Sequence, residues 1–142
     1  MFISTKGRYA VRILIDLAEQ FNLGEKGYIP MKEVAARQEI SLKYVGSIMP
    51  LLKNANLVAG MHGVGGGYRL VKPPEQYNLW EILQAAEGKL APVSCLLNDT
   101  VLCKRIKNCK TLPIWKKYYK ITQEFFSNIL LSDVVEKTLK FN

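Results

Sequence analysis

The stretch LVAGMHGVGGGYRLV, residues 57–71, decides the fold. Two short apolar runs, Leu57-Val58-Ala59 and Tyr68-Arg69-Leu70-Val71, flank the turn Gly63-Val64-Gly65-Gly66-Gly67. Short β-prone runs joined by a glycine-rich tip are typical of a β-hairpin. Whether this hairpin is the wing of a larger unit depends on the helices that precede it.

Helical patterns fill the chain before the hairpin. Apolar residues recur at helical spacing from Tyr9 to Phe21, after Ser4 or Thr5 as N-cap, and a second helix is expected over residues 31–38. Ser41 is expected to cap a third helix over residues 42–54, which Pro50 should bend or interrupt. A helix, a short turn and a well-capped helix form a helix-turn-helix. We therefore expect a mainly α fold with a small β wing, in which residues 1–72 form a winged helix-turn-helix DNA-binding domain.

Residues 73–142 are predicted to hold a cysteine-containing sensor loop and dimerisation helices. Asn78 and Glu81 resemble the capping box of a short helix, and Ser132 is expected to cap a last one that contains Leu139. Between them a long helix begins near residue 112, and its apolar face comprises Ile114, Trp115, Tyr118, Ile121, Phe125, Phe126, Ile129 and Leu130. Such a face favours a symmetric homodimer, in which a second copy covers it. The alternative is that it packs onto the winged domain of its own chain.

Composition limits the classes of partner. The chain has 142 residues and a formal net charge of +8, which favours nucleic acid or another polyanion. Apolar residues make up 49% of the chain and charged residues 23%, a balance that excludes an intrinsically disordered protein. No apolar run approaches the roughly 18 residues of a membrane-spanning helix, and the start lacks the apolar core of a signal peptide. We therefore expect no membrane partner and a cytoplasmic location.

The cysteines Cys95, Cys103 and Cys109 follow one another with spacers of seven and five residues. An odd number of thiols cannot all pair within one chain, and a reducing compartment disfavours disulfides. Three thiolates from one loop suit a soft metal or an iron–sulfur cluster, which takes four ligands. Nearby basic residues, Lys104 and Arg105 among them, favour the thiolate form. Zinc and a disulfide switch without a cluster remain open alternatives.

Five motifs occur in this order: Ser4-Thr5-Lys6-Gly7-Arg8-Tyr9-Ala10, Ile40-Ser41-Leu42-Lys43-Tyr44-Val45, Gly63-Val64-Gly65-Gly66-Gly67-Tyr68-Arg69-Leu70, Ala91-Pro92-Val93-Ser94-Cys95 and Cys109-Lys110-Thr111-Leu112-Pro113-Ile114-Trp115. Together they resemble the Rrf-type transcriptional regulators, whose members include the IscR, NsrR and CymR groups. The similarity covers nearly the whole chain. It implies a homodimer that represses or activates transcription at a double-stranded DNA operator. Many members sense iron–sulfur status, nitric oxide, redox state or cysteine metabolism.

Candidate DNA-binding residues follow from the helix and the wing. They are Arg8, Ser41, Lys43, Tyr44, Ser47, His62, Gly63, Gly65 and Arg69, together with Arg12 as a further phosphate partner. The alternatives are that Tyr44 packs against the first helix, that the serines only cap, that His62 is a solvated loop residue and that the arginines form surface ion pairs. Relatives commonly carry a larger polar residue at Gly46, so this departure removes a possible base contact and affects any inherited operator sequence. They usually carry an arginine at His62, and a histidine there would be a weaker anchor in the minor groove.

In the cluster-binding relatives, cysteines that match Cys95, Cys103 and Cys109 hold the cluster, so the resemblance implies a 2Fe-2S or 4Fe-4S cofactor. The fourth ligand is unknown. One group uses a histidine where this chain has Leu112, and another uses an acidic residue where it has Arg8. Asp99, a backbone or solvent oxygen, a small thiol or an open iron could complete the set.

The function expected from these observations is a homodimeric, sequence-specific DNA-binding transcriptional regulator that senses iron–sulfur cluster or redox state through its cysteines. The first alternative is a cluster-free regulator of the same fold that responds to thiols or a metabolite. A second is an interaction module that binds protein or RNA. An enzyme is excluded because the glycine run lacks the Lys-Ser/Thr of a phosphate-binding loop and no nucleophile–base pair is present.

Overall fold

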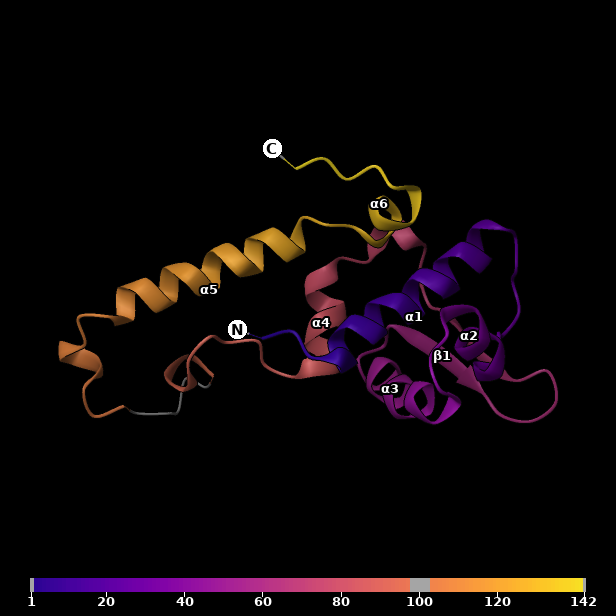
Figure 1. Cartoon of the computed structure of the whole chain (residues 1–142), viewed down its shortest axis with the longest axis horizontal. Coiled ribbons are helices and arrows are strands. Elements are labelled where there is room, and N and C mark those ends of the chain that lie inside the picture. The colour runs from indigo at the N-terminus through magenta and orange to yellow at the C-terminus, as the bar shows by residue number, and fades with distance from the viewer. Residues whose placement is uncertain (1, 98–102, 142) are drawn as a thin grey trace.

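The computed structural model describes residues 2–97 and 103–141. The elements are α1 (Thr5–Asn22), α2 (Met31–Gln38), α3 (Leu42–Asn54), β1 (Val58–Met61), β2 (Gly67–Leu70), η1 (Pro74–Gln76), α4 (Leu79–Glu87), η2 (Ser94–Leu96), η3 (Ile106–Asn108), α5 (Leu112–Ser127) and α6 (Leu131–Glu136). Helices α1 to α3 and the β1–β2 hairpin gather at one end of the molecule, and α5 extends away from them (Figure 1). The predicted fold class, mainly α with a small β wing, is confirmed. None of the described helices is long and apolar enough to cross a membrane.

Side-chain caps define where the first and third helices begin. The Ser4 hydroxyl accepts from the backbone N–H of Gly7 at the start of α1, as expected for an N-cap. Glu87 at the end of α4 reinforces this start, because its carboxylate accepts from the backbone N–H of Ser4 at 2.8 Å and of Gly7 at 3.1 Å. At α3 the Ser41 hydroxyl accepts from the backbone N–H of Tyr44 at 3.1 Å.

Helix α3 runs through Pro50 without a break, so the expected interruption is wrong. Proline removes the hydrogen bond to the carbonyl of the residue four positions earlier, here Gly46. Pro50 is exposed and a side chain at Gly46 would meet only open space, so solvent can reach the carbonyl that loses its donor. The helix therefore tolerates its proline on the solvent side.

A single core joins the helix-turn-helix to the elements after it. Ala10, Ile13 and Leu14 of α1 are completely buried. They share this core with Ile82 of α4 and Leu131 of α6, which are also fully buried. The domain boundary at residue 72 stays a prediction, with helices from both sides of it in one core.

Tyr77 connects the base of the hairpin to this core by hydrogen bonds. Its side chain is fully buried, and its hydroxyl donates to the carbonyl of Leu57 at 2.6 Å and accepts from the backbone N–H of Val71 at 3.0 Å. Burial raises the pKa of the Tyr77 hydroxyl, so the group keeps the proton that it donates. The two ends of the hairpin are thereby held by one side chain.

An ion pair between the half-exposed Arg37 and the buried carboxylate of Asp16, which the sequence pattern did not predict, joins α2 to α1. Asp16 has no exposed surface, and Arg37 donates to both of its carboxylate oxygens at 2.9 Å. The side-chain amide of Gln38 donates to the same carboxylate at 3.3 Å. The hydrogen bond to Asp16 raises the pKa of Arg37, which keeps the pair charged.

The last helix begins and ends earlier than predicted. Ser132 lies inside α6 rather than capping it, the N-cap is Leu130, and Leu139 lies beyond the helix. Backbone pairing fixes this start, because the N–H of Leu131 donates to the carbonyl of Tyr77 at 3.0 Å. The capping box of Asn78 and Glu81 at α4 is confirmed.

Candidate nucleic-acid interface and cysteine segment

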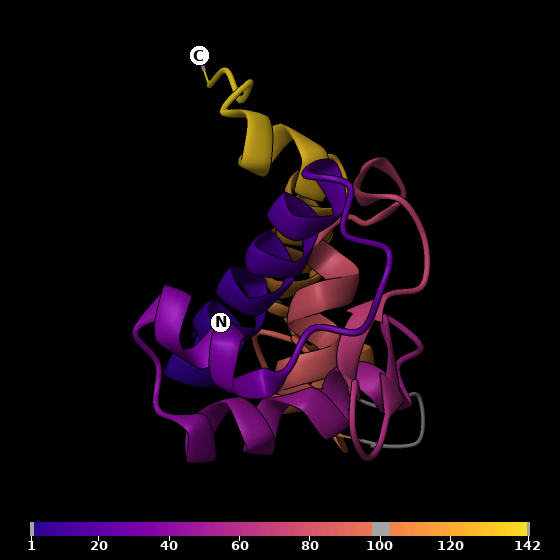
Figure 2. The same cartoon turned by 90° about the vertical axis from the view of Figure 1, so that its right-hand side faces the viewer.

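The predicted recognition helix, α3, lies at one edge of the molecule, beside the hairpin (Figures 1 and 2). Ser41, Lys43 and Ser47 are exposed. Both serines also bond to their own helix, Ser41 as N-cap and Ser47 by donating to the carbonyl of Tyr44 at 2.7 Å. Lys43 forms no ion pair within residues 2–97 and 103–141, so its ammonium group is available to an anion.

Tyr44 connects α3 to α1. Its half-buried ring meets the ring of Tyr9 edge-on, with 5.2 Å between the ring centroids. The guanidinium of Arg12 lies 5.1 Å from the centroid of the Tyr9 ring and donates to the backbone carbonyl of Gln38 at the end of α2. The ring of Tyr44 thus packs against the first helix, as in the alternative expectation for this residue.

The wing depends on glycine in its turn and at the first residue of β2. Gly63 and Gly65 have φ angles of +89° and +74°, which side chains rarely allow. A side chain at Gly67 would come within 2.1 Å of the carbonyl oxygen of Ile29. That approach lets Ile29 and Tyr68 exchange two backbone hydrogen bonds of 2.8 Å, so the wing is tied to the segment before α2.

The predicted arginines do not all lie on the same face. Arg8 is exposed on α1 and donates to the hydroxyl of Thr5 at 3.0 Å. Arg69 lies 4.5 Å from the ring centroid of Tyr28 and donates to the carbonyl of Lys26. Successive strand residues point to opposite faces, so Arg69 faces away from the side of the wing that carries Tyr68. Neither arginine forms an ion pair in the described part of the chain, contrary to the alternative expectation.

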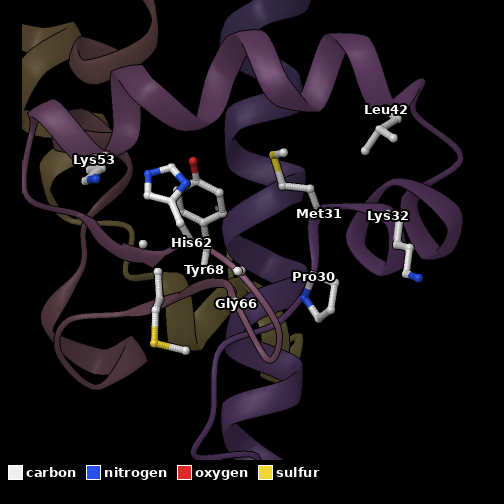
Figure 3. A pocket seen from close by; sticks show the side chains of 12 residues that line it. Pro30, Met31, Lys32, Leu42, Lys53, His62, Gly66 and Tyr68 are labelled. Atoms are coloured by element: carbon white, nitrogen blue, oxygen red, sulfur yellow. The ribbon is translucent and has the colours of Figure 1, made fainter.

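An open pocket of about 380 Å³ separates α3 from the wing (Figure 3). Its lining includes Met31 of α2, Lys53 of the last turn of α3, and His62 and Tyr68 of the wing. Sequence reasoning assigned His62 but missed Lys53 and Tyr68. The alternation of strand residues was the signal for Tyr68, because it places this ring on the face opposite to Arg69.

The three cysteines are free thiols at two places. Cys95 lies in η2, whereas Cys103 and Cys109 line one pocket before α5 together with Arg105 and Thr111. The Thr111 hydroxyl, 3.4 Å from the Cys109 sulfur, lowers the pKa of that thiol, and backbone N–H groups at the start of α5 add to the effect.

The donor set fits a soft metal or cluster by type but not by arrangement. Three thiols are suitable ligands. Within residues 2–97 and 103–141, however, no three His, Cys, Asp or Glu side chains come together as a metal site. Asp99, one of the candidates for a fourth ligand, lies outside the described residues.

Comparison with known proteins identifies the family. The Rrf2 family, described as iron-dependent transcriptional regulators, matches residues 3–137. The chain belongs to this family. Its Rrf2 relatives are transcriptional regulators rather than enzymes, which agrees with the exclusion of an enzyme.

Curated and solved Rrf2 relatives resemble the chain over almost its full length. The HTH-type transcriptional regulator IscR of Sodalis glossinidius is 31% identical over 135 residues, which cover 95% of this chain and 79% of the relative. The structure of CymR, the global cysteine regulator of B. subtilis, is 29% identical with a TM-score of 0.73 and covers 96% of this chain and 98% of that one. The structure of T. potens IscR is 27% identical with a TM-score of 0.71, covering 98% and 89%. The chain is therefore an Rrf2-family transcriptional regulator.

Proposed function

We propose that this Rrf2 regulator binds a double-stranded DNA operator as a homodimer and senses iron–sulfur cluster or redox state through Cys95, Cys103 and Cys109. The observation that carries the DNA-binding part is the exposed face that α3 and the wing form together. It offers the ammonium group of Lys43, the hydroxyls of Ser41 and Ser47 and a glycine-rich tip that lets backbone approach a phosphate closely. We retain the expectation that the regulator works in the cytoplasm.

The uncovered face of α5 supports the homodimer. Ile114, Tyr118, Ile121 and Phe125 recur along one side of the helix and are 58%, 45%, 51% and 48% exposed. The opposite side already has a partner, because Tyr119 packs 5.9 Å from the ring of Trp80. A second copy of α5 would cover the exposed face and make a two-fold symmetric pair of wings and α3 helices. Two operator half-sites would then lie about one helical turn apart, or a multiple of it.

The cysteine segment supports the sensing role because it joins the two functional parts. It runs from the end of α4 to the start of α5, where the Thr111 hydroxyl lowers the pKa of the Cys109 thiol. A bound iron–sulfur cluster would supply ligand bonds that draw the three thiols together and would be sensitive to oxidation. On the protein side, Thr111 holds the Cys109 sulfur at the first turn of α5. A change in the loop would therefore reach the dimer helix directly.

A salt titration tests the DNA-binding part. Duplexes that bind best would be selected from a random pool, and their affinity would be measured by fluorescence anisotropy at increasing salt concentrations. A dimer that neutralises several phosphates should show a slope of log K against log salt of about −0.9 for each phosphate. A flat response, or equal affinity for RNA of the same sequence, would sink this part of the proposal.

Anaerobic purification tests the sensing part. We expect a coloured protein with iron and sulfide, whose DNA affinity changes on exposure to oxygen. The variant with all three cysteines replaced by serine should be colourless and should not respond. An iron-free, colourless wild type that still switches on thiol oxidation would overturn cluster sensing in favour of the cluster-free alternative, without affecting the DNA-binding part.

A further inference from the structure

The pocket between α3 and the wing has two different kinds of lining. The apolar part is formed by Met31, Leu42 and the ring of Tyr68. The polar part comprises Lys53 at one end, the imidazole of His62 and, on the rim at the other end, Lys32 (Figure 3). None of its lining residues is acidic. A pocket with this lining suits a ligand that is anionic on one side and apolar on the other.

The hydroxyl of Tyr68 gives the pocket a donor. The Tyr68 ring lies over Gly60, where a side-chain carbon would come within 2.9 Å of it, so this glycine leaves room for the ring. Its hydroxyl points toward α3 (Figure 3). No hydrogen bond joins this hydroxyl to another group among the residues that the structure describes. The backbone of Tyr68 is fixed by its pairing with Ile29, so the donor stands in a defined place.

We propose that this pocket seats one sugar–phosphate strand of the operator, with Lys53 and the Tyr68 hydroxyl as ligands of a phosphodiester. The inference rests on the proposed function and deepens it. A helix that enters the major groove and a wing that reaches the adjacent minor groove must straddle the strand between the two grooves. The pocket lies between those two elements. Phosphate oxygens meet the ammonium group and the hydroxyl, and the deoxyribose meets Met31 and Leu42.

The charge of Lys53 can be tested by salt dependence. Lys53→Gln should weaken binding and make the slope of log K against log salt shallower by about 0.9, because one phosphate contact is lost. Lys140→Gln is the matched control, because it removes the same charge from the C-terminal tail, far from α3 (Figure 1). The result that overturns the proposal is a Lys53→Gln slope equal to that of Lys140→Gln. If the wild type itself shows no salt-dependent binding to any duplex, the proposed function fails instead.

The hydroxyl of Tyr68 can be tested without changing charge. Tyr68→Phe keeps the ring over Gly60 and should lower operator affinity about threefold to tenfold with no change in the salt slope. Thermal unfolding of the variant should match that of the wild type. Unchanged affinity would remove Tyr68 from the contact.

Operators that carry a single uncharged phosphate analogue show which phosphate of the DNA strand lies in the pocket. Operators in which one phosphate at a time is replaced by a methylphosphonate should include a position where wild-type affinity falls but Lys53→Gln affinity does not fall further. Additive losses at every position would overturn the assignment. Inorganic phosphate and a mononucleotide carry similar chemistry, so both are titrated against the free protein and followed by NMR at Tyr68. Binding of either one in the pocket, without any effect of Lys53→Gln on DNA, would assign the pocket to a free anion and overturn the proposal.

Discussion

Helices α1 and α5 have similar amphipathic patterns, but they differ in what covers them. The apolar residues of α1 that face inward, such as Ile13 and Leu17, are buried by α2, α3, α4 and α6. In α5 the corresponding face stays exposed, and of this helix only Leu112 is buried. The apolar period therefore predicts a helix equally well in both cases. Burial alone tells whether the partner of the apolar face belongs to the same chain.

The two regions also differ in whether their polar groups find partners within the chain. In the core around the helix-turn-helix, the polar groups of the buried side chains of Asp16, on α1, and Tyr77, at the base of the hairpin, are satisfied within the chain. The C-terminal region instead offers thiols and an aromatic helix face to the outside. The helix-turn-helix thus shares one satisfied core with α4 and α6, whereas the exposed face of α5 would be covered only in the homodimer that we propose. The predictions below test this difference.

The largest expected effect concerns the ion pair between Asp16 of α1 and Arg37 of α2. Arg37→Met would leave the fully buried carboxylate of Asp16 with only Gln38 as a donor, and this should lower the free energy of unfolding by about 3 kcal/mol. Denaturant unfolding measures the loss. Glu33→Gln is the control, because it breaks only an exposed pair with Arg37 at 3.6 Å and should cost less than about 0.5 kcal/mol.

A second variant decides whether the loss comes from the unpaired charge. Asp16→Asn combined with Arg37→Met removes both charges and should recover a large part of the stability lost in the single variant. Equal stability of the single and double variants would mean that the carboxylate is not held by Arg37. The helix-turn-helix region would then not be as self-contained as the comparison with α5 implies.

The next effect concerns the uncovered face of α5. Ile121→Asp should raise the dissociation constant of the homodimer about 100-fold, because it places a charge in the centre of the proposed interface. Its unfolding as a monomer should be nearly unchanged, since the side chain is 51% exposed within the chain. Sedimentation velocity over a range of protein concentrations measures the dimer.

Gln123→Asp serves as the control because it adds the same charge on another side of α5, at an exposed position. It should leave the dimer intact. If Ile121→Asp and Gln123→Asp behave alike, the apolar face of α5 is not the dimer contact, and the contrast between α1 and α5 needs another explanation.

A smaller effect is expected at the base of the wing. Tyr77→Phe keeps the buried ring but leaves the carbonyl of Leu57 without its donor, so it should destabilise the fold by about 1–3 kcal/mol. Tyr118→Phe on the exposed face of α5 loses no described hydrogen bond and should change monomer stability by less than about 0.5 kcal/mol. Thermal unfolding of both variants checks the pair. Equal losses of stability in the two variants would contradict the idea that the region around the hairpin depends on internal hydrogen bonds to a greater extent than α5 does.

The sequence predicted the winged helix-turn-helix because its signals are local. Ser41, Asn78 and the glycines of the wing act within a few residues of themselves, and each was found where expected. Contacts between distant residues carry no such signal. Asp16 and Arg37 pair across 21 positions, and the start of α6 is fixed by backbone pairing with Tyr77 rather than by a cap at Ser132.

The same limit applies to the candidate site. The outward residues of α3 and the glycines of the wing were predictable from periodicity and φ preferences, whereas the pocket that Lys53 and Tyr68 share forms only when α3 and the hairpin pack together. The cysteine ligand set stays a prediction, because the spacing of three thiols does not determine how a loop folds around a ligand.

The smallest expected effect concerns the wing, which is exposed like the apolar face of α5. His62 is exposed next to the wing tip. His62→Arg should raise operator affinity about threefold to tenfold and steepen the salt slope by up to about 0.9, because a permanent cation joins the phosphate contacts. His62→Ala should weaken binding slightly. Fluorescence anisotropy at several salt concentrations measures both variants.

These two variants also test whether the DNA-binding surface and the dimer surface act independently. The wing and α5 lie at different ends of the molecule, so neither change at His62 should alter the dimer constant in sedimentation experiments (Figure 1). If His62→Arg and His62→Ala both bind the operator like the wild type, His62 is a solvated loop residue, as the alternative expectation holds. If either one changes the dimer constant, the surface that binds DNA and the surface that binds the second copy are not independent.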